Sequence, residues 1–100
     1  MVKHVILWKL KEGYSEKEKE QIRQDAKKHL EGLKEKVPQI REIHVQAECL
    51  DTSTADLMLD SSFDTAEALK EYSGHPDHVA VADKYIRPFM ELRTCLDYEV

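Results

Sequence analysis

Residues Val2-Lys3-His4-Val5-Ile6-Leu7-Trp8-Lys9-Leu10 decide the fold of this 100-residue chain. They form a bounded apolar run with β-branched and aromatic side chains, which predicts a strand, and the turn-like residues 11–14 end it. Alternation gives the strand one face with Val5 and Leu7 and another with His4, Ile6, Trp8 and Leu10. Both faces carry large apolar groups, so both need cover.

A long helix is expected next. Ser15-Glu16-Lys17-Glu18 has the spacing of a capping box, in which the serine hydroxyl and the Glu18 carboxylate satisfy early backbone N–H groups. An apolar stripe at helical spacing follows at Ile22, Ala26, Leu30 and Leu33. Pro38 forbids continuation, so we expect the helix to end before it.

The remainder predicts three more strands and a second helical region. Alternating or apolar runs place strands at residues 40–47, 57–63 and 92–100. Asp64-Thr65-Ala66-Glu67 is a second cap signature, and it predicts a helix that ends near Gly74. Pro76 then suits the first turn of another helical piece that runs to about Arg87.

The order β, α, β, β, α, β is the split βαβ plan of an α+β domain, with a four-stranded antiparallel sheet and the helices on one face. We expect one domain over residues 1–100. Since the helices cover only one side, burial predicts a homodimer in which a second copy covers the other. We expect His4, Ile6 and Trp8 to face the barrel interior that this pairing creates.

Composition excludes several classes of partner. The formal net charge is -5 and no stretch gathers Lys and Arg, which argues against nucleic acid. Residues 1–10 are too short to span a membrane and lack a cleavage site, so we expect a cytoplasmic protein without membrane contact. Cys49 and Cys95 have no zinc-site spacing, and we interpret both as reduced packing residues.

Several motifs together resemble the stress-responsive A/B barrel family, often called Dabb. They are the opening strand Val2–Lys9, the segment His75-Pro76-Asp77-His78-Val79, the turn Ile86-Arg87-Pro88-Phe89 and the ending Asp97-Tyr98-Glu99-Val100. The resemblance covers nearly the whole chain. It implies a ferredoxin-like monomer and a dimeric α/β barrel, but it does not fix one activity.

The resemblance also implies candidate site residues. In a plant polyketide cyclase of this family, a tyrosine, the second histidine of the H-P-x-H segment and a first-strand histidine line the pocket. The matching positions here are Tyr72, His78 and His4.

These residues fit proton abstraction beside a carbonyl. His78 would be the base, Tyr72 would donate a hydrogen bond to the carbonyl oxygen, and His4 would orient the substrate or the base. We expect the pocket lining to include Ile6, Trp8, Met58 and Asp60. The structural alternative is that His78 caps the turn at Pro76, Tyr72 fills the core with its hydroxyl at the surface, and His4 is a satisfied buried histidine.

No metal or organic cofactor is expected. A metal site would need His4, His78 and a carboxylate such as Asp60 or Asp77 to converge, and no ligand spacing supports that. The ligand would be a small apolar or carbonyl-containing compound. Three functions stay open: a cofactor-independent cyclase or lyase, a non-catalytic stress-responsive binding or structural dimer, and a cofactor-free monooxygenase.

Overall fold

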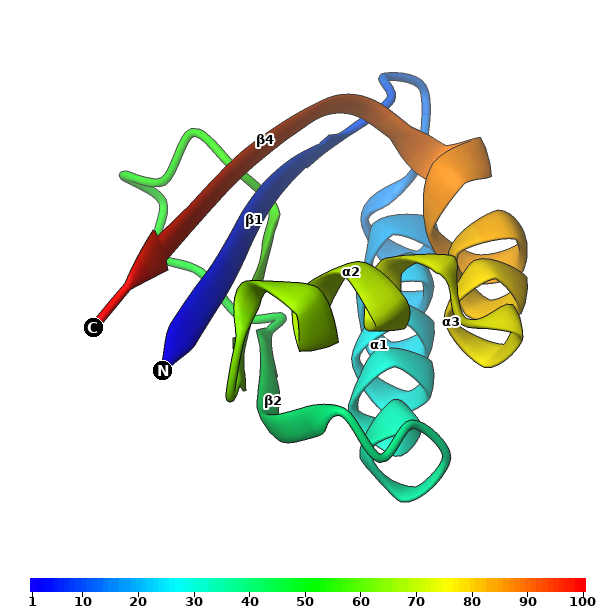
Figure 1. The fold of residues 1–100 in the computed structure, drawn as a ribbon. Helices are drawn as coiled ribbons and strands as arrows, with labels where there is room; N and C mark the ends of the chain where they lie inside the picture. Colours follow the sequence, from blue (N-terminus) through cyan, green and yellow to red (C-terminus); the bar gives the residue numbers. More distant parts are fainter.

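The computed structural model describes residues 1–100 as one sheet covered on one side by helices (Figure 1). The strands are β1 (Val2–Leu10), β2 (Ile40–Gln46), β3 (Leu57–Phe63) and β4 (Met90–Glu99). The helices are α1 (Glu16–Glu31), α2 (Ala66–Gly74) and α3 (Pro76–Val81). Short helical turns follow α1 as η1 (Gly32–Glu35) and α3 as η2 (Ala82–Ile86) and η3 (Arg87–Phe89). No helix is both long enough and apolar enough to cross a bilayer.

The four strands lie in the order β2-β3-β1-β4, and every neighbouring pair is antiparallel. This confirms the predicted split βαβ plan. β1 lies at the centre of the sheet, whereas β4 is an edge strand whose residues are mostly exposed. The central place of β1 explains why its sequence is apolar on both faces.

Local sequence signals set the ends of α1. Ser15 Oγ accepts a hydrogen bond from the Glu18 backbone N–H at 3.1 Å, and Glu18 Oε1 accepts one from the Ser15 backbone N–H at 2.9 Å. The predicted capping box is therefore present. The helix ends at Glu31, earlier than Pro38 requires, because the chain tightens at Gly32 into the turn η1, where Leu33 is still buried.

The helical region after β3 is broken at His75. Thr65 caps α2 through its hydroxyl, which accepts from the Ala68 N–H at 3.0 Å. His75 is extended and caps α3, because its Nδ1 accepts from the Asp77 N–H at 3.1 Å while Pro76 fills the first turn. The break was predicted from Pro76, and the histidine side chain completes it.

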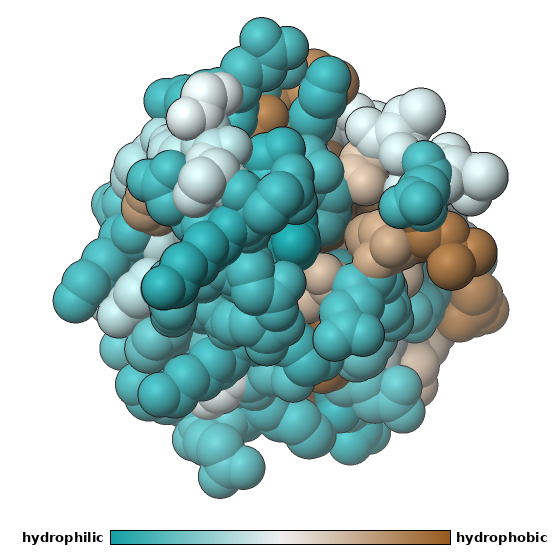
Figure 2. All heavy atoms as spheres, turned by 180° about the vertical axis from the view of Figure 1, so that it is seen from behind, coloured by the Kyte–Doolittle hydropathy of each residue, from teal (hydrophilic) through white to brown (hydrophobic).

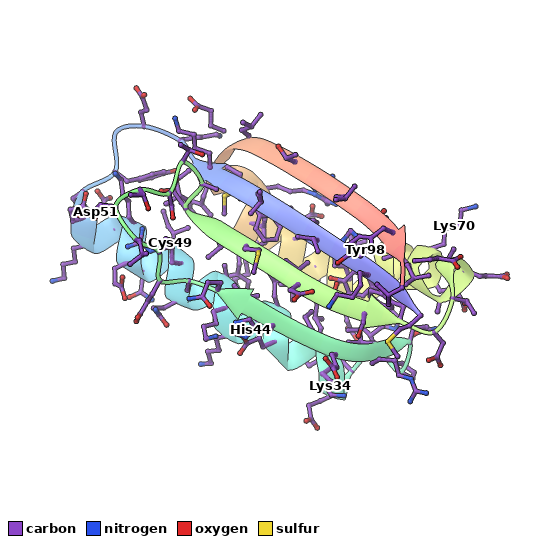
Figure 3. All side chains as sticks on the ribbon, turned by 90° about the vertical axis from the view of Figure 1, so that its left-hand side faces the viewer. Lys34, His44, Cys49, Asp51, Lys70 and Tyr98 are labelled. Carbon is purple, nitrogen blue, oxygen red and sulfur yellow. The ribbon has the colours of Figure 1, made fainter.

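One face of the sheet has no helix over it, and Figure 3 looks onto this face with the helices behind. It carries Leu7, Leu96 and Tyr98, which are 43%, 63% and 43% exposed. In the view of Figure 2 most of the surface is hydrophilic and the hydrophobic residues gather along one margin. The bare apolar face inferred from the sequence is thus present.

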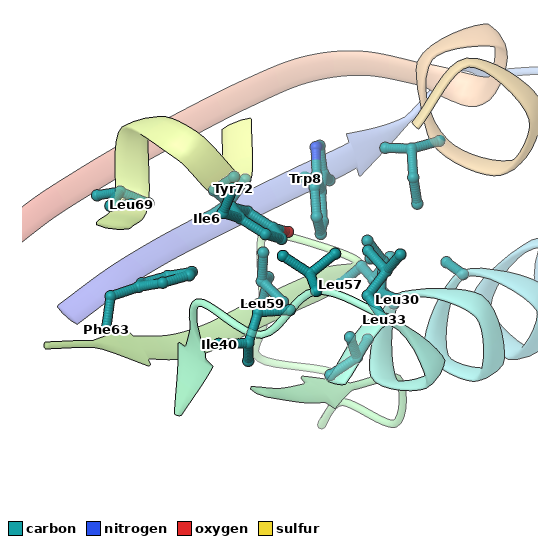
Figure 4. Packing of buried hydrophobic residues seen from close by; sticks show 14 of the residues in the cluster. Ile6, Trp8, Leu30, Leu33, Ile40, Leu57, Leu59, Phe63, Leu69 and Tyr72 are labelled. Atoms are coloured by element: carbon teal, nitrogen blue, oxygen red, sulfur yellow. The ribbon is translucent and has the colours of Figure 1, made fainter. Parts of the chain in front are cut away.

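The side chains of β1 that lie on the uncovered face are not the ones expected. His4, Ile6 and Trp8 are only 4 to 5% exposed. Ile6 and Trp8 belong to the core beneath the helices (Figure 4), and His4 lies on the same face of β1. The prediction that they face a barrel interior outside the helices was wrong. Alternation separates the two sets of side chains, but it does not say which set the helices cover. Here the helices cover the bulkier set.

Candidate functional site

A cavity of about 530 Å³ lies between the helix side of the sheet and the region from α2 through η3. Eight of its 14 lining residues are hydrophobic, so it suits a ligand with an apolar body. Polar groups lie around this apolar wall. The lining residues are His4, Ile6, Trp8, Leu30, Leu59, Ser73, His78, Ala82, Ile86, Arg87, Met90, Glu91, Leu92 and Arg93.

His4 reaches the cavity from β1. It lies directly across from Asp97 on β4, and its Nδ1 is 2.5 Å from Asp97 Oδ1. An ionised carboxylate only accepts hydrogen bonds, so Nδ1 carries the proton and Nε2 keeps the lone pair. Asp97 thereby fixes both the orientation and the tautomer of the buried imidazole.

His78 enters from α3. Its Nδ1 donates to the Ser73 carbonyl oxygen at 3.0 Å, which leaves the lone pair on Nε2. Burial lowers the pKa of His78 below its usual value, and the guanidinium charges of Arg87 and Arg93 act in the same direction, whereas the Ser73 hydrogen bond opposes them. The imidazole is therefore neutral at pH 7 and can take a proton.

Tyr72 packs between the two histidines. Its ring centroid is 4.3 Å from that of His78 and 6.2 Å from that of His4. The side chain is fully buried, and its hydroxyl oxygen has no hydrogen-bond partner. Burial raises the pKa of the phenol, so it stays protonated and can only donate or accept a hydrogen bond at neutral pH.

The structure therefore brings His4, Tyr72 and His78 together, although they come from β1, α2 and α3. Tyr72 is not itself part of the cavity wall. In Figure 4 its hydroxyl extends toward Trp8 and Leu59, which do line the cavity. The alternative that Tyr72 reaches the surface is excluded, because the hydroxyl is buried.

Two of the predicted lining residues lie elsewhere. Ile6 and Trp8 line the cavity, whereas Met58 and Asp60 pair with Leu7 and Val5 and share the uncovered face of the sheet. The Asp60 carboxylate is 2.6 Å from Lys3 Nζ in an ion pair. Met58 and Asp60 therefore lie away from this cavity, on the opposite face of the sheet.

Three residues of β4 near the cavity were not predicted: Arg93 lines it, whereas Cys95 and Asp97 contact His4. Arg93, Cys95 and Asp97 alternate along β4 and share the helix side of the sheet with Trp8, Ile6 and His4. Strand periodicity groups them, but only the register between β1 and β4 shows that Asp97 meets His4. Cys49 and Cys95 are free, as expected, yet both are exposed rather than packed.

The fold and the cavity define a ferredoxin-like α+β protein with a pocket between helices and sheet. The model of the Stress Responsive A/B Barrel Domain family, Dabb, matches residues 2–100, and the chain belongs to this family. The resemblance drawn from the motifs is confirmed.

Solved structures share this fold. A dimeric protein of unknown function from Bacteroides fragilis has 35% sequence identity and a TM-score of 0.92, over 99% of this chain and 95% of that one. A hydroxynitrile lyase from Passiflora edulis has 19% identity and a TM-score of 0.72, over 97% and 90%. A putative antibiotic biosynthesis monooxygenase from Nitrosomonas europaea has 14% identity and a TM-score of 0.76, over 100% and 98%. The comparison with curated proteins gave no match.

The substitution Tyr72→Phe tests whether the buried hydroxyl lacks a structural partner. We expect the free energy of unfolding to stay the same or rise by about 1 kcal/mol, because an unsatisfied polar group is removed and the ring is kept. Tyr14→Phe, next to Phe89 and away from the cavity, is the control. Urea unfolding at one protein concentration measures both. A loss above about 1 kcal/mol for Tyr72→Phe alone would show a hidden partner.

The lowered pKa of His78 predicts a pH effect on stability. Below the ordinary histidine value of about 6.5, the unfolded chain takes up a proton at this position before the folded chain does. The free energy of unfolding should therefore fall as the pH drops below about 6.5 toward the folded pKa. His78→Gln should make this fall shallower. Parallel slopes in urea titrations of the two proteins would contradict the prediction.

Proposed function

We propose that this protein is a homodimer whose cavity binds a small apolar, carbonyl-containing compound and removes a proton from the carbon beside the carbonyl. The reaction would be that of a cofactor-independent cyclase or lyase. The observation that carries the proposal is Tyr72, a buried phenol without a partner, packed against His78 and close to His4.

His78 is suited to the role of base. Its Nδ1–H is held by the Ser73 carbonyl, so Nε2 carries the free lone pair, and its lowered pKa keeps the ring neutral. The proton would pass from the substrate carbon to Nε2, while the electron pair of the broken C–H bond moves into the carbonyl to form an enolate. The imidazolium would later return the proton to the product.

Tyr72 is suited to stabilise the enolate oxygen. The phenol stays protonated, and its hydroxyl has no bond to give up before it donates to a ligand. A buried donor that meets developing negative charge stabilises it more than a donor in water does. His4, fixed by Asp97, would orient the substrate at the other side of Tyr72.

Charge near the cavity fits a ligand that is rich in oxygen. Arg87 and Arg93 both line the cavity, and the Arg87 guanidinium is paired with Asp83 on the same helical segment. The likeness to a hydroxynitrile lyase supports lyase chemistry on this fold. The likeness to a putative monooxygenase keeps cofactor-free oxygenation as a weaker alternative.

The second candidate is a non-catalytic binding or structural dimer. Tyr72 is absent from the cavity wall, so a ligand must shift side chains to reach its hydroxyl. In addition, His78 and Ser73 bond across the break between α2 and α3, which agrees with a capping role. Under this reading the cavity would hold an apolar ligand without reaction. The free thiols of Cys49 and Cys95 fit the expected cytoplasmic location under both functions.

Proton abstraction is tested by deuterium exchange at the carbon between the carbonyls of a small β-keto thioester, followed by NMR in D₂O. We expect the wild-type protein to speed exchange, and His78→Gln to reduce this by at least about 100-fold, as for loss of a general base. Tyr72→Phe should slow exchange while retaining binding. His29→Gln, a half-buried histidine on α1 that stacks on Tyr85 and lies outside the cavity, should behave like the wild type.

The two candidates give opposite results in this experiment. Thermal stabilisation by the thioester without exchange, equal in all four proteins, would replace the catalytic proposal with the binding one. Exchange that persists in His78→Gln would remove His78 as the base.

The proposed homodimer forms through the uncovered face of the sheet. Leu7, Leu96 and Tyr98 leave an apolar surface there, and the protein from Bacteroides fragilis at 35% identity is described as dimeric. The cavity lies on the opposite, helical side of the sheet. Dimerisation therefore covers the apolar face without building the pocket.

Leu96→Asp tests this interface. We expect the dimer to weaken by more than about tenfold and shift toward a species of one chain mass, 11.6 kDa, because a charge replaces an apolar contact. Ala80→Asp, at an exposed apolar position on α3 on the helical side of the sheet, is the matched control and should stay dimeric. Sedimentation equilibrium measures both. Dissociation by Ala80→Asp alone would move the interface elsewhere.

A further inference from the structure

Three different metal-binding groups meet where β1 and β4 pair. They are Nδ1 of His4, Sγ of Cys95 and Oδ1 of Asp97. The nitrogen lies 2.5 Å from the carboxylate oxygen and 3.7 Å from the sulfur, and the sulfur lies 3.5 Å from the same oxygen. All three atoms are within 4.8 Å of one another.

The backbone creates this cluster. Cys95 and Asp97 are two apart on β4, so their side chains leave the same face of the sheet. Asp97 pairs directly with His4, and Cys95 pairs with Ile6, so the thiol is the diagonal neighbour of His4. The three positions are therefore fixed by strand register rather than by flexible loops.

The spacing suits a tetrahedral ion. Zinc binds thiolate sulfur at about 2.3 Å, imidazole nitrogen at about 2.0 to 2.1 Å and carboxylate oxygen at about 2.0 to 2.2 Å, which places its ligands about 3.3 to 3.6 Å apart. Both distances from the Cys95 sulfur are already close to this range. Only His4 and Asp97 must separate, by about 0.8 Å, when a metal replaces the shared proton.

The charges also balance. A thiolate and a carboxylate supply two negative charges, and a neutral imidazole adds none, so a divalent cation makes the cluster neutral. Arg93 lies two residues before Cys95 on the same face and is the positive side chain that faces the thiol. Because thiolate is a soft ligand, the set favours zinc over magnesium or calcium.

We propose that His4, Cys95 and Asp97 form a binding site for Zn²⁺ with a fourth position open to solvent or ligand. This site goes beyond the proposed function, which uses no metal. His4 also lines the cavity, so the ion would lie at the edge of the pocket. A metal on Nδ1 moves the imidazole proton to Nε2, which turns that nitrogen from an acceptor into a hydrogen-bond donor.

Cobalt supplies a spectroscopic test. The reduced full-length protein is titrated with Co²⁺, whose bond to a thiolate gives a charge-transfer band in the near ultraviolet. We expect saturation at one ion per chain, loss of the band in Cys95→Ser, and an unchanged band in Cys49→Ser. Cys49 is the other exposed free thiol and the matched control.

Zinc affinity, measured by equilibrium dialysis, completes the test. Cys95→Ser and Asp97→Asn should each weaken Zn²⁺ binding by more than about tenfold, since loss of even an outer partner has that effect. Both positions are exposed, so the variants should fold, and an amide NMR spectrum checks this. Millimolar Mg²⁺ should not compete.

Three results would overturn the site: no Co²⁺ or Zn²⁺ binding by the wild type, a thiolate band that survives in Cys95→Ser, or Zn²⁺ affinity unchanged in Asp97→Asn. None of these results bears on deuterium exchange by His78, so the two proposals stand or fall separately.

Discussion

β1 occupies the middle of the sheet, and each of its side chains must fit one of two different environments. On the helical side it presents an apolar row that includes Ile6 and Trp8, with His4 as the polar member of that row. A buried imidazole needs a hydrogen-bond partner, and Asp97 on the neighbouring strand supplies it. The core, the cavity and the His4 tautomer all depend on this arrangement.

Short-range signals allowed much of the fold to be predicted. The capping box at Ser15, the cap at Thr65 and the break at Pro76 are local, because each depends on residues a few positions apart. Strand order followed from the sequence of elements. The face of the sheet that the helices cover could not be predicted, because β1 is apolar on both sides and volume, not periodicity, decides between them.

The site could be predicted only in part, for the same physical reason. Tyr72, His78 and His4 came from matching motifs, and they do lie together. Met58 and Asp60 lie on the face of the sheet opposite the cavity, because they flank Leu59 on β3 and Leu59 points into it. Asp97 and Cys95 depend on the pairing of the first and last strands, 93 and 91 residues away from His4 in sequence, which no local pattern encodes.

The uncovered face and the cavity lie on opposite sides of one four-stranded sheet, which therefore acts as a partition. Two copies joined through their bare faces would carry two chambers directed away from each other, with two layers of backbone between them. No side chain of β1 can serve both surfaces, because successive residues point in opposite directions. Changes that tune assembly and changes that tune ligand choice thus fall on separate sets of residues, and each chamber should fill independently of the other.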